Sequence, residues 1–309
     1  MMRAFWDSAG MLIVFLALFV ALSMFLPNFF SWPNLVGLAL AVSMVGMVSC
    51  TMLFCLASGD FDLSIESIVA FSGVLSAVVV NETTSVGLGI AAGIAAGGLV
   101  GLVNGLVIAR LRINALITTL ATMQIVHGLC FIVSGGTAVG IANENFFLLG
   151  MSSILGVPVP VWITTVCFIF FGVLLNKTAF GRHTLAIGGN RESARLAGIA
   201  VERTKVIIFA MQGLVAGFAG VILASRMASG QPNTSVGFSL DVISACVLGG
   251  VSLSGGVGTI TGTIVGVLIM GTVQNAMNLA NIPPFYQYVV RGAILLAAVT
   301  FDQLKQRRK

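Results

Sequence analysis

Long apolar stretches alternate with short polar connections along the whole chain. Each stretch is close to the ~20 residues that an α-helix needs to cross a bilayer. They predict about ten crossings, near residues 11–30, 35–57, 61–80, 86–109, 114–133, 159–175, 206–228, 238–253, 256–279 and 288–302. The stretch at 61–80 opens with acidic residues, and that at 238–253 is short and rich in Gly and Ser. We expect one or both to be a broken or re-entrant helix.

Glycines recur every four residues in two of these stretches. The first ladder is Gly89, Gly93, Gly97, Gly101 and Gly105, and the second is Gly258, Gly262 and Gly266. This spacing puts the glycines on one helix face and is typical of membrane helices in close contact. An amide lies near the end of each ladder: Asn104 in the first, and Gln274 with Asn275 in the second.

A polar break that begins with glycine precedes each ladder, at residues 59–64 and 237–241. The third and fourth crossings therefore match the eighth and ninth. Because an offset of five crossings reverses direction, the pattern predicts two inverted repeats, a common plan for transporters. The alternative is that glycine ladders serve only packing, as they do in many helical membrane proteins.

The composition agrees with this interpretation. Hydrophobic residues make up 58% of the chain and charged residues 8%, with a mean hydropathy of +1.07. A soluble core cannot bury so much apolar surface, so we predict an all-α polytopic membrane protein with one transmembrane domain over residues 1–309. The five cysteines lie singly in apolar stretches, which predicts no disulfide, metal or cofactor. The first stretch could be read as a signal peptide, but we expect it to be retained as the first helix.

Basic residues predict the orientation. Thirteen of the fifteen fall on one side of a ten-crossing arrangement, which is the cytoplasmic side by the positive-inside rule. They are Arg3, Arg110, Arg112, the six basic residues between 176 and 205, and Lys305, Arg307, Arg308 and Lys309. Arg226 and Arg291 are the exceptions, each near an outer helix end. Both termini are then cytoplasmic, and the pI of 9.2 reflects topology rather than nucleic-acid binding.

The loop at 176–205 holds six of the fifteen basic residues. Asn190 can cap a two-turn helix and Gly198 can end it, so we expect a helix on the water side of the membrane that either docks on a partner or is only a surface helix. Its candidate contact residues are Asn190, Arg191, Glu192, Ala194, Arg195, Leu196 and Gly198.

Ionisable groups also occur at crossings. Asp60, Asp62 and Glu66 open the third crossing and Asp241 opens the eighth, where charges are costly and often functional. Asp60 and Asp62 could either cap the helix or line a substrate path. Glu66 could pair with a base on another helix, and we expect Asp241 to face an interior cavity. His127, one turn after Gln124, is better explained as an interhelical hydrogen-bonding group than as a proton relay.

No enzymatic motif is present in the sequence: it has no Walker loop, HExxH, CxxC or GxSxG. We therefore predict that the chain is not an enzyme. If a nucleotide powers transport, the motor is another chain.

Three segments resemble the monosaccharide ABC importer permeases, a family that includes ribose, galactose, xylose and arabinose permeases. They are 59–64, 186–199 and 248–258, and the segments 52–62, 114–124 and 225–232 resemble the L-arabinose members in particular. The resemblance implies an inner-membrane permease that works as two copies, with a cytoplasmic ATPase of two tandem nucleotide-binding domains and a periplasmic sugar-binding protein. It also implies that the central loop docks on the ATPase. Many family members carry Gly where this chain has Glu66.

A path for a neutral sugar needs hydroxyl and amide groups that bind weakly enough to release it. Our candidates are Ser64, Asn104, Asp241, Gln274 and Asn275. Permeases for other sugars remain alternatives, because related pentoses differ only in hydroxyl configuration. A proton-coupled secondary transporter is a further alternative, with Asp60, Asp62, Glu66 and Asp241 as its relay. An intramembrane enzyme or a scaffold is disfavoured, since the chain offers no nucleophile and base pair.

Overall fold

The computed structural model describes residues 2–307, with side chains for residues 10–300 and 303. Of the residues used above for orientation, Arg3, Lys305, Arg307, Arg308 and Lys309 lie outside the described side chains. The α-helices are α1 (Met2–Phe25), α2 (Trp32–Ala57), α3 (Ile65–Thr83), α4 (Val86–Arg110), α5 (Ala115–Ser134), α6 (Leu148–Met151), α7 (Val159–Lys177), α8 (Ala179–Gly189), α9 (Arg191–Leu196), α10 (Val201–Met227), α11 (Phe238–Leu248), α12 (Ile260–Leu279) and α13 (Pro284–Arg307).

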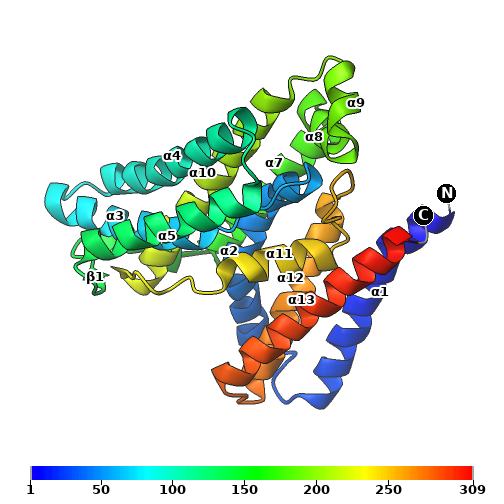
Figure 1. The fold of residues 1–309 in the computed structure, drawn as a ribbon. Helices are drawn as coiled ribbons and strands as arrows, with labels where there is room; N and C mark the ends of the chain where they lie inside the picture. The colour runs from blue at the N-terminus through cyan, green and yellow to red at the C-terminus, as the bar shows by residue number, and fades with distance from the viewer. Residues whose placement is uncertain (1, 308–309) are drawn as a thin grey trace. The chain divides into compact units, whose positions relative to one another are not determined.

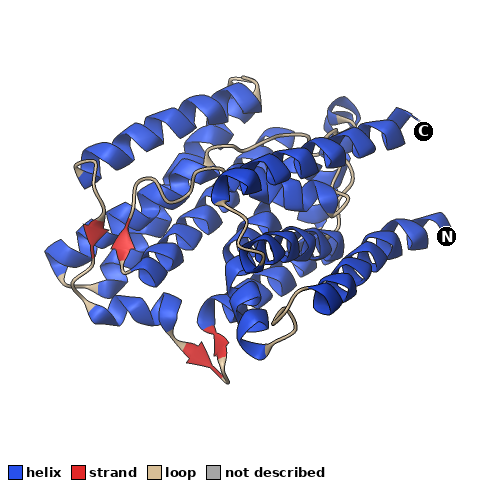
Figure 2. Ribbon diagram, turned by 90° about the horizontal axis from the view of Figure 1, so that it is seen from below, coloured by secondary structure: helices blue, strands red, loops and turns tan. Residues whose placement is uncertain are grey.

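The other regular elements are short and lie between helices (Figure 2). A 3₁₀ helix, η1 (Glu144–Phe147), precedes α6. Strand β1 (Val139–Gly140) pairs antiparallel with β4 (Ser229–Gly230). Strand β2 (Ser153–Ile154) forms a hairpin with β3 (Val157–Pro158). The protein is therefore an all-α polytopic membrane protein, as predicted.

Among the described residues, seven helices are long and apolar enough to cross a membrane: α2, α3, α4, α5, α7, α10 and α12. They match seven of the ten predicted crossings. The eighth stretch forms only the 11-residue α11, which ends at Leu248 before a turn with Gly250 at φ +84°. The third opens with non-helical residues up to Ser64, because the helix begins at Ile65. Crossings by α1, α11 and α13 stay predictions.

The chain folds into two compact units. Unit 1 comprises Met1–Gly59, Cys167–Gly189 and Leu240–Lys309, and unit 2 comprises Asp60–Val166 and Asn190–Ser239. Unit 2 contains α3, α4 and α5, the third to fifth crossings, together with α10, the seventh. Unit 1 contains most of α11 and all of α12 and α13, the eighth to tenth crossings, together with α2, the second. The second and seventh crossings, which are equivalent in the predicted repeats, are thus exchanged between the units, whereas α7 is divided between them and α1 lies in unit 1. This exchange agrees with an internal repeat, whereas the inversion and the single transmembrane domain stay predictions.

In unit 2, α4 lies along α10, and α3 packs against both (Figure 1). The first glycine ladder is buried in this contact. A Cβ atom on Gly97 would lie 2.4 Å from the Gly213 carbonyl oxygen, and one on Gly213 would lie 2.2 Å from the Gly97 carbonyl oxygen. Backbone therefore meets backbone, and neither position has room for a side chain.

The second ladder makes an equally close contact in unit 1. A Cβ on Gly262 would lie 2.1 Å from the Gly249 carbonyl oxygen, and one on Gly266 would approach the Ala245 carbonyl oxygen. Gly258 is a correction to the predicted ladder, because it precedes α12 and is not on the helix. Thr259 caps this helix, accepting a hydrogen bond from the Gly262 amide at 3.1 Å, so the helical spacing starts only after it.

The ladder gives a direct test of packing. Replacing Gly97 with Leu should force α4 and α10 apart and lower the free energy of unfolding by roughly 1–3 kcal/mol or more. Gly87 lies on the same helix, and a Cβ added there would have no atom within 4 Å, so Gly87→Leu is the matched control. Thermal unfolding of both purified variants measures the difference. Equal melting temperatures would contradict the packing assignment.

Candidate coupling and translocation site

Helix α9 in the central loop has the predicted caps at both ends. The Asn190 side-chain oxygen accepts a hydrogen bond from the Ser193 amide at 2.9 Å, which satisfies a free N–H of the first turn. At the other end Gly198 adopts φ +82°, and the Ile199 amide donates to the Ala194 carbonyl at 3.1 Å. These are the bonds of a glycine-terminated helix. The local sequence therefore determines the start and the end of α9.

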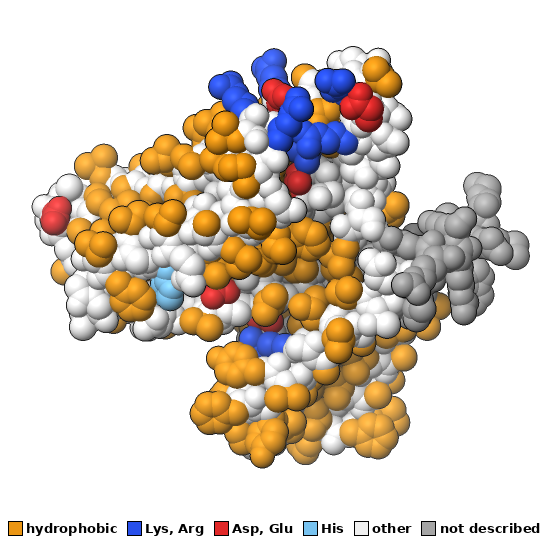
Figure 3. All heavy atoms as spheres, viewed as in Figure 1, with side chains coloured by type: hydrophobic (Ala, Val, Ile, Leu, Met, Phe, Trp, Pro, Cys, Tyr) orange, Lys and Arg blue, Asp and Glu red, His pale blue; other side chains and the backbone are white. Residues whose placement is uncertain are grey.

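The outer face of α9 combines charge with an exposed apolar side chain. Ala194 is buried, whereas Leu196 is 79% exposed. Arg195 pairs with Glu192 at 3.0 Å on the surface, and Arg112 lies 3.9 Å from Glu202 nearby. Lys and Arg side chains gather around α9 on the face drawn in Figure 3, while apolar side chains cover much of α4 and α5. Leu196 therefore protrudes from α9 among charged side chains.

Lys205 differs from the other basic residues of the central loop. The positive-inside pattern places it with the charges at the water side, but only 5% of it is exposed. Its Nζ lies 2.6 Å from Oδ2 of Asp60, which is also buried. Sequence reasoning missed this pair because α10 begins at Val201, five residues before the predicted crossing, so that Lys205 lies on the buried side of the first turns of this helix. The cytoplasmic coupling loop over residues 176–205 stays a prediction.

Beside this pair, buried polar groups form a chain of hydrogen bonds. Ser64 donates its amide and its hydroxyl to Asp62 Oδ1, at 2.9 and 2.6 Å. The Asn104 side-chain amide donates to Ser64 Oγ at 2.9 Å, and the Thr122 hydroxyl donates to Asn104 Oδ1 at 2.7 Å. The network joins α4 and α5 to the start of α3. It brings together Ser64 and Asn104, two of the predicted path residues.

The other predicted path residues lie in unit 1. Asp241 and Gln274 line one small cavity, as expected for Asp241. Asp241 also accepts a hydrogen bond from Arg291 at 3.0 Å, so Arg291 faces protein. Asn275 instead exchanges two hydrogen bonds with Asn34 of α2, at 2.9 and 3.0 Å. No sequence signal pointed to Asn34, because a single amide at a helix start is common.

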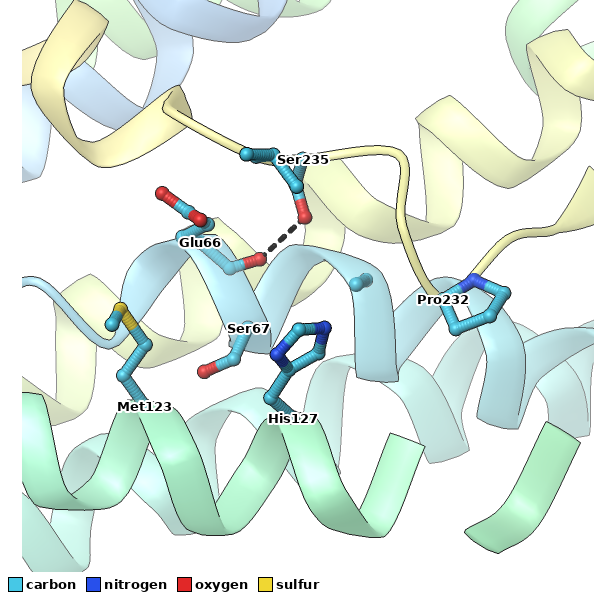
Figure 4. A pocket seen from close by; sticks show the side chains of 8 residues that line it. Glu66, Ser67, Met123, His127, Pro232 and Ser235 are labelled. Carbon is cyan, nitrogen blue, oxygen red and sulfur yellow. Dashed lines mark hydrogen bonds between the residues drawn. The ribbon is translucent and has the colours of Figure 1, made fainter. Parts of the chain in front are cut away.

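The Glu66 side chain binds the first turn of α11 and the residue before that helix, not a base on another helix. Its carboxylate accepts hydrogen bonds from the Gly237 amide at 2.9 Å and from the Ser239 hydroxyl at 3.1 Å. The Ser235 hydroxyl donates to the Glu66 backbone carbonyl (Figure 4). His127 lines the same pocket, and the Glu66 carboxylate points away from its ring (Figure 4). The expected pairing of Glu66 with a base is therefore corrected to a cap of the 237–239 break.

Comparison with known proteins identifies the family. The family described as branched-chain amino acid transport system / permease component matches residues 34–299. This chain belongs to that permease family. No solved structure matches it significantly.

Curated relatives of the permease match it over almost their full length. It is 64% identical to the L-arabinose transport system permease protein AraH of Escherichia coli (strain K12), over 98% of this chain and 93% of the relative. The L-arabinose ABC transporter permease protein AraH of Azospirillum brasilense is 58% identical, over 98% and 89%. The ribose import permease protein RbsC of Bacillus subtilis (strain 168) is 42% identical, over 94% and 92%. These relatives are translocation components, in agreement with the prediction that the chain is not an enzyme.

The hydrogen-bonded chain around Asn104 yields a second test. Asn104→Ala removes the donor to Ser64 and the acceptor of Thr122, which should lower the free energy of unfolding by about 1–3 kcal/mol. Val103, exposed on the same helix, provides the control Val103→Ala. Thermal unfolding in detergent compares the two. If Asn104→Ala melts at the wild-type temperature, the network does not stabilise the contact of α3, α4 and α5.

Proposed function

We propose that this permease is the membrane subunit of an ATP-driven importer of L-arabinose. The identity of 64% to one arabinose permease and 58% to another, against 42% to a ribose permease, carries the proposal. Each match covers at least 94% of this chain. The sugar assignment rests on this graded similarity, since hydroxyl and amide groups alone do not distinguish pentoses.

The proposed assembly has two copies of this permease, a cytoplasmic ATPase with two tandem nucleotide-binding domains, and a periplasmic sugar-binding protein. It lies in the bacterial inner membrane with both termini in the cytoplasm. Helix α9 docks on the ATPase. The exposure of Leu196 and the charges of Arg191, Glu192 and Arg195 support this role, because a small apolar anchor within a polar rim is a common form of protein contact.

The sugar path in this proposal uses Ser64 and Asn104 in unit 2, and Asp241, Gln274 and Asn275 in unit 1. Each is a hydroxyl, amide or carboxylate group in a largely apolar helical protein. Such groups replace the hydrogen bonds that a sugar loses on leaving water, without binding it tightly. Ser64 and Asn104 are fully buried, so a sugar would reach them only after the start of α3 has moved.

A proton-coupled transporter fits the contacts less well. Asp60 is paired with Lys205, Asp241 is paired with Arg291, and Glu66 accepts bonds from residues 237–239. Asp62, the fourth candidate of the relay, accepts the amide and hydroxyl hydrogen bonds of Ser64, so each of the four carboxylates is engaged in a contact within the protein. ATP is therefore the proposed source of energy.

Uptake measurements separate the two energy sources. Proteoliposomes that contain the permease, its ATPase and the loaded binding protein should accumulate L-arabinose when ATP is supplied and an ionophore has collapsed the proton gradient. Omitting ATP should abolish uptake, and D-ribose should be transported poorly in the same system. Uptake that stops with the ionophore while ATP is still hydrolysed would favour the proton-coupled alternative.

A substitution in α9 tests the docking surface. Leu196→Asp places a charge where an apolar anchor is proposed, so recovery of the ATPase with the purified permease should fall by roughly tenfold or more. Leu155, which is 88% exposed at the turn between β2 and β3, gives the control Leu155→Asp. Normal recovery of the ATPase with both variants would count against α9 as the docking helix.

A further inference from the structure

The buried ion pair between Asp60 and Lys205 has no role in the function proposed so far. Both residues are more than nine-tenths buried, and their charged atoms are 2.6 Å apart. Transfer of two charges out of water is costly, and their attraction offsets that cost only while they stay in contact. The contact therefore ties together the two segments that carry these residues.

One of these segments follows directly from the docking helix. Helix α9 ends at Leu196, and α10 begins at Val201 after a tight turn in which the Val201 amide donates to the Ile199 carbonyl at 2.8 Å. Helices α9 and α10 also pack against each other. A displacement of α9 therefore reaches the first turns of α10, where Lys205 lies.

The other segment leads into the buried polar network. Asp60 stands in the non-helical stretch before α3, two residues before Asp62, which binds Ser64. A short irregular segment bends more easily than a helix, because fewer backbone hydrogen bonds hold it. A force applied at Asp60 would therefore act on Ser64 and, through it, on Asn104.

Three buried polar atoms, on the segment before α3 and on α10, lack a hydrogen-bond partner among the described residues. They are Asp62 Oδ2 and both polar side-chain atoms of Gln212. Gln212 is seven residues after Lys205, so the two share one face of α10. Leaving a buried polar group unpaired is unfavourable, so any shift of α3 against α10 that satisfies these groups is favoured.

We infer that Lys205 is a positioning residue that transmits movement of α9 to the start of α3 through its ion pair with Asp60. The inference rests on the proposed docking of α9 on an ATPase. When the ATPase closes and moves α9, the first turns of α10 carry Lys205, and the paired Asp60 draws the 60–64 segment with it. The hydrogen bonds of Ser64 and Asn104 then rearrange.

Hydrogen exchange of the complete transporter in lipid nanodiscs tests this inference. Exchange is compared without nucleotide and with the ATPase trapped by ATP and vanadate. In the wild type, trapping should change exchange both in α9 and in residues 60–68. In the double variant Asp60→Asn/Lys205→Met, which removes both charges together, the response of residues 60–68 should shrink roughly tenfold while that of α9 persists.

The matched control is Thr204→Val, a substitution of the buried neighbour whose hydroxyl bonds only within its own helix, to the Ala200 carbonyl. It should respond as the wild type does. If the double variant does not fold, Lys205→Met, which leaves no donor for Asp60, replaces it in the same measurement. A wild-type response of residues 60–68 in whichever charge variant folds would overturn the inference.

The outcomes separate this inference from the proposed function. The exchange measurement reads out the permease and not the transported sugar, so a wrong sugar assignment appears in uptake. If trapping leaves α9 unchanged in the wild type, the docking proposal fails. If α9 responds but residues 60–68 do not, docking stands and the transmission through Lys205 is wrong.

Discussion

The close contact between α4 and α10 is the constraint on which unit 2 depends. Because Gly97 and Gly213 carry no side chains, the two backbones approach until each carbonyl fills the space that a Cβ would need. This approach leaves no room for water between the helices and buries Asn104 at the end of the ladder. A buried amide has to find partners, and Ser64 and Thr122 provide them. Packing thus determines where the polar groups meet.

The ion pairs of this apolar protein are of two kinds, one exposed to water and one buried. On α9, Glu192 and Arg195 are solvated, and their ion pair contributes little to stability. Between α10 and the start of α3, Asp60 and Lys205 are removed from water, so that separating them would be costly. The first kind of charge is free to meet a partner, and the second kind keeps segments together. Arg195 and Lys205 are close along the chain, and in our inference movement passes from the first to the second.

Much of the fold could be predicted from sequence, because apolar length and glycine spacing are local signals. The caps Asn190 and Gly198 likewise determine α9 from neighbouring residues alone. The partners of Lys205 and Glu66 could not be predicted, since they depend on which helices meet across more than a hundred residues of chain. The second ladder shows the same limit. Gly258 keeps the four-residue spacing, but Thr259 starts the helix after it.

Helix α9 is, in our proposal, the point at which a partner ATPase acts on this permease. A cryo-electron microscopy structure of the permease bound to that ATPase tests the proposal most directly. We expect the ATPase to bury Leu196 and to contact Arg191 or Arg195, while Lys205 remains paired with Asp60. A complex in which Leu196 stays exposed and the ATPase is held by other segments would contradict the proposal.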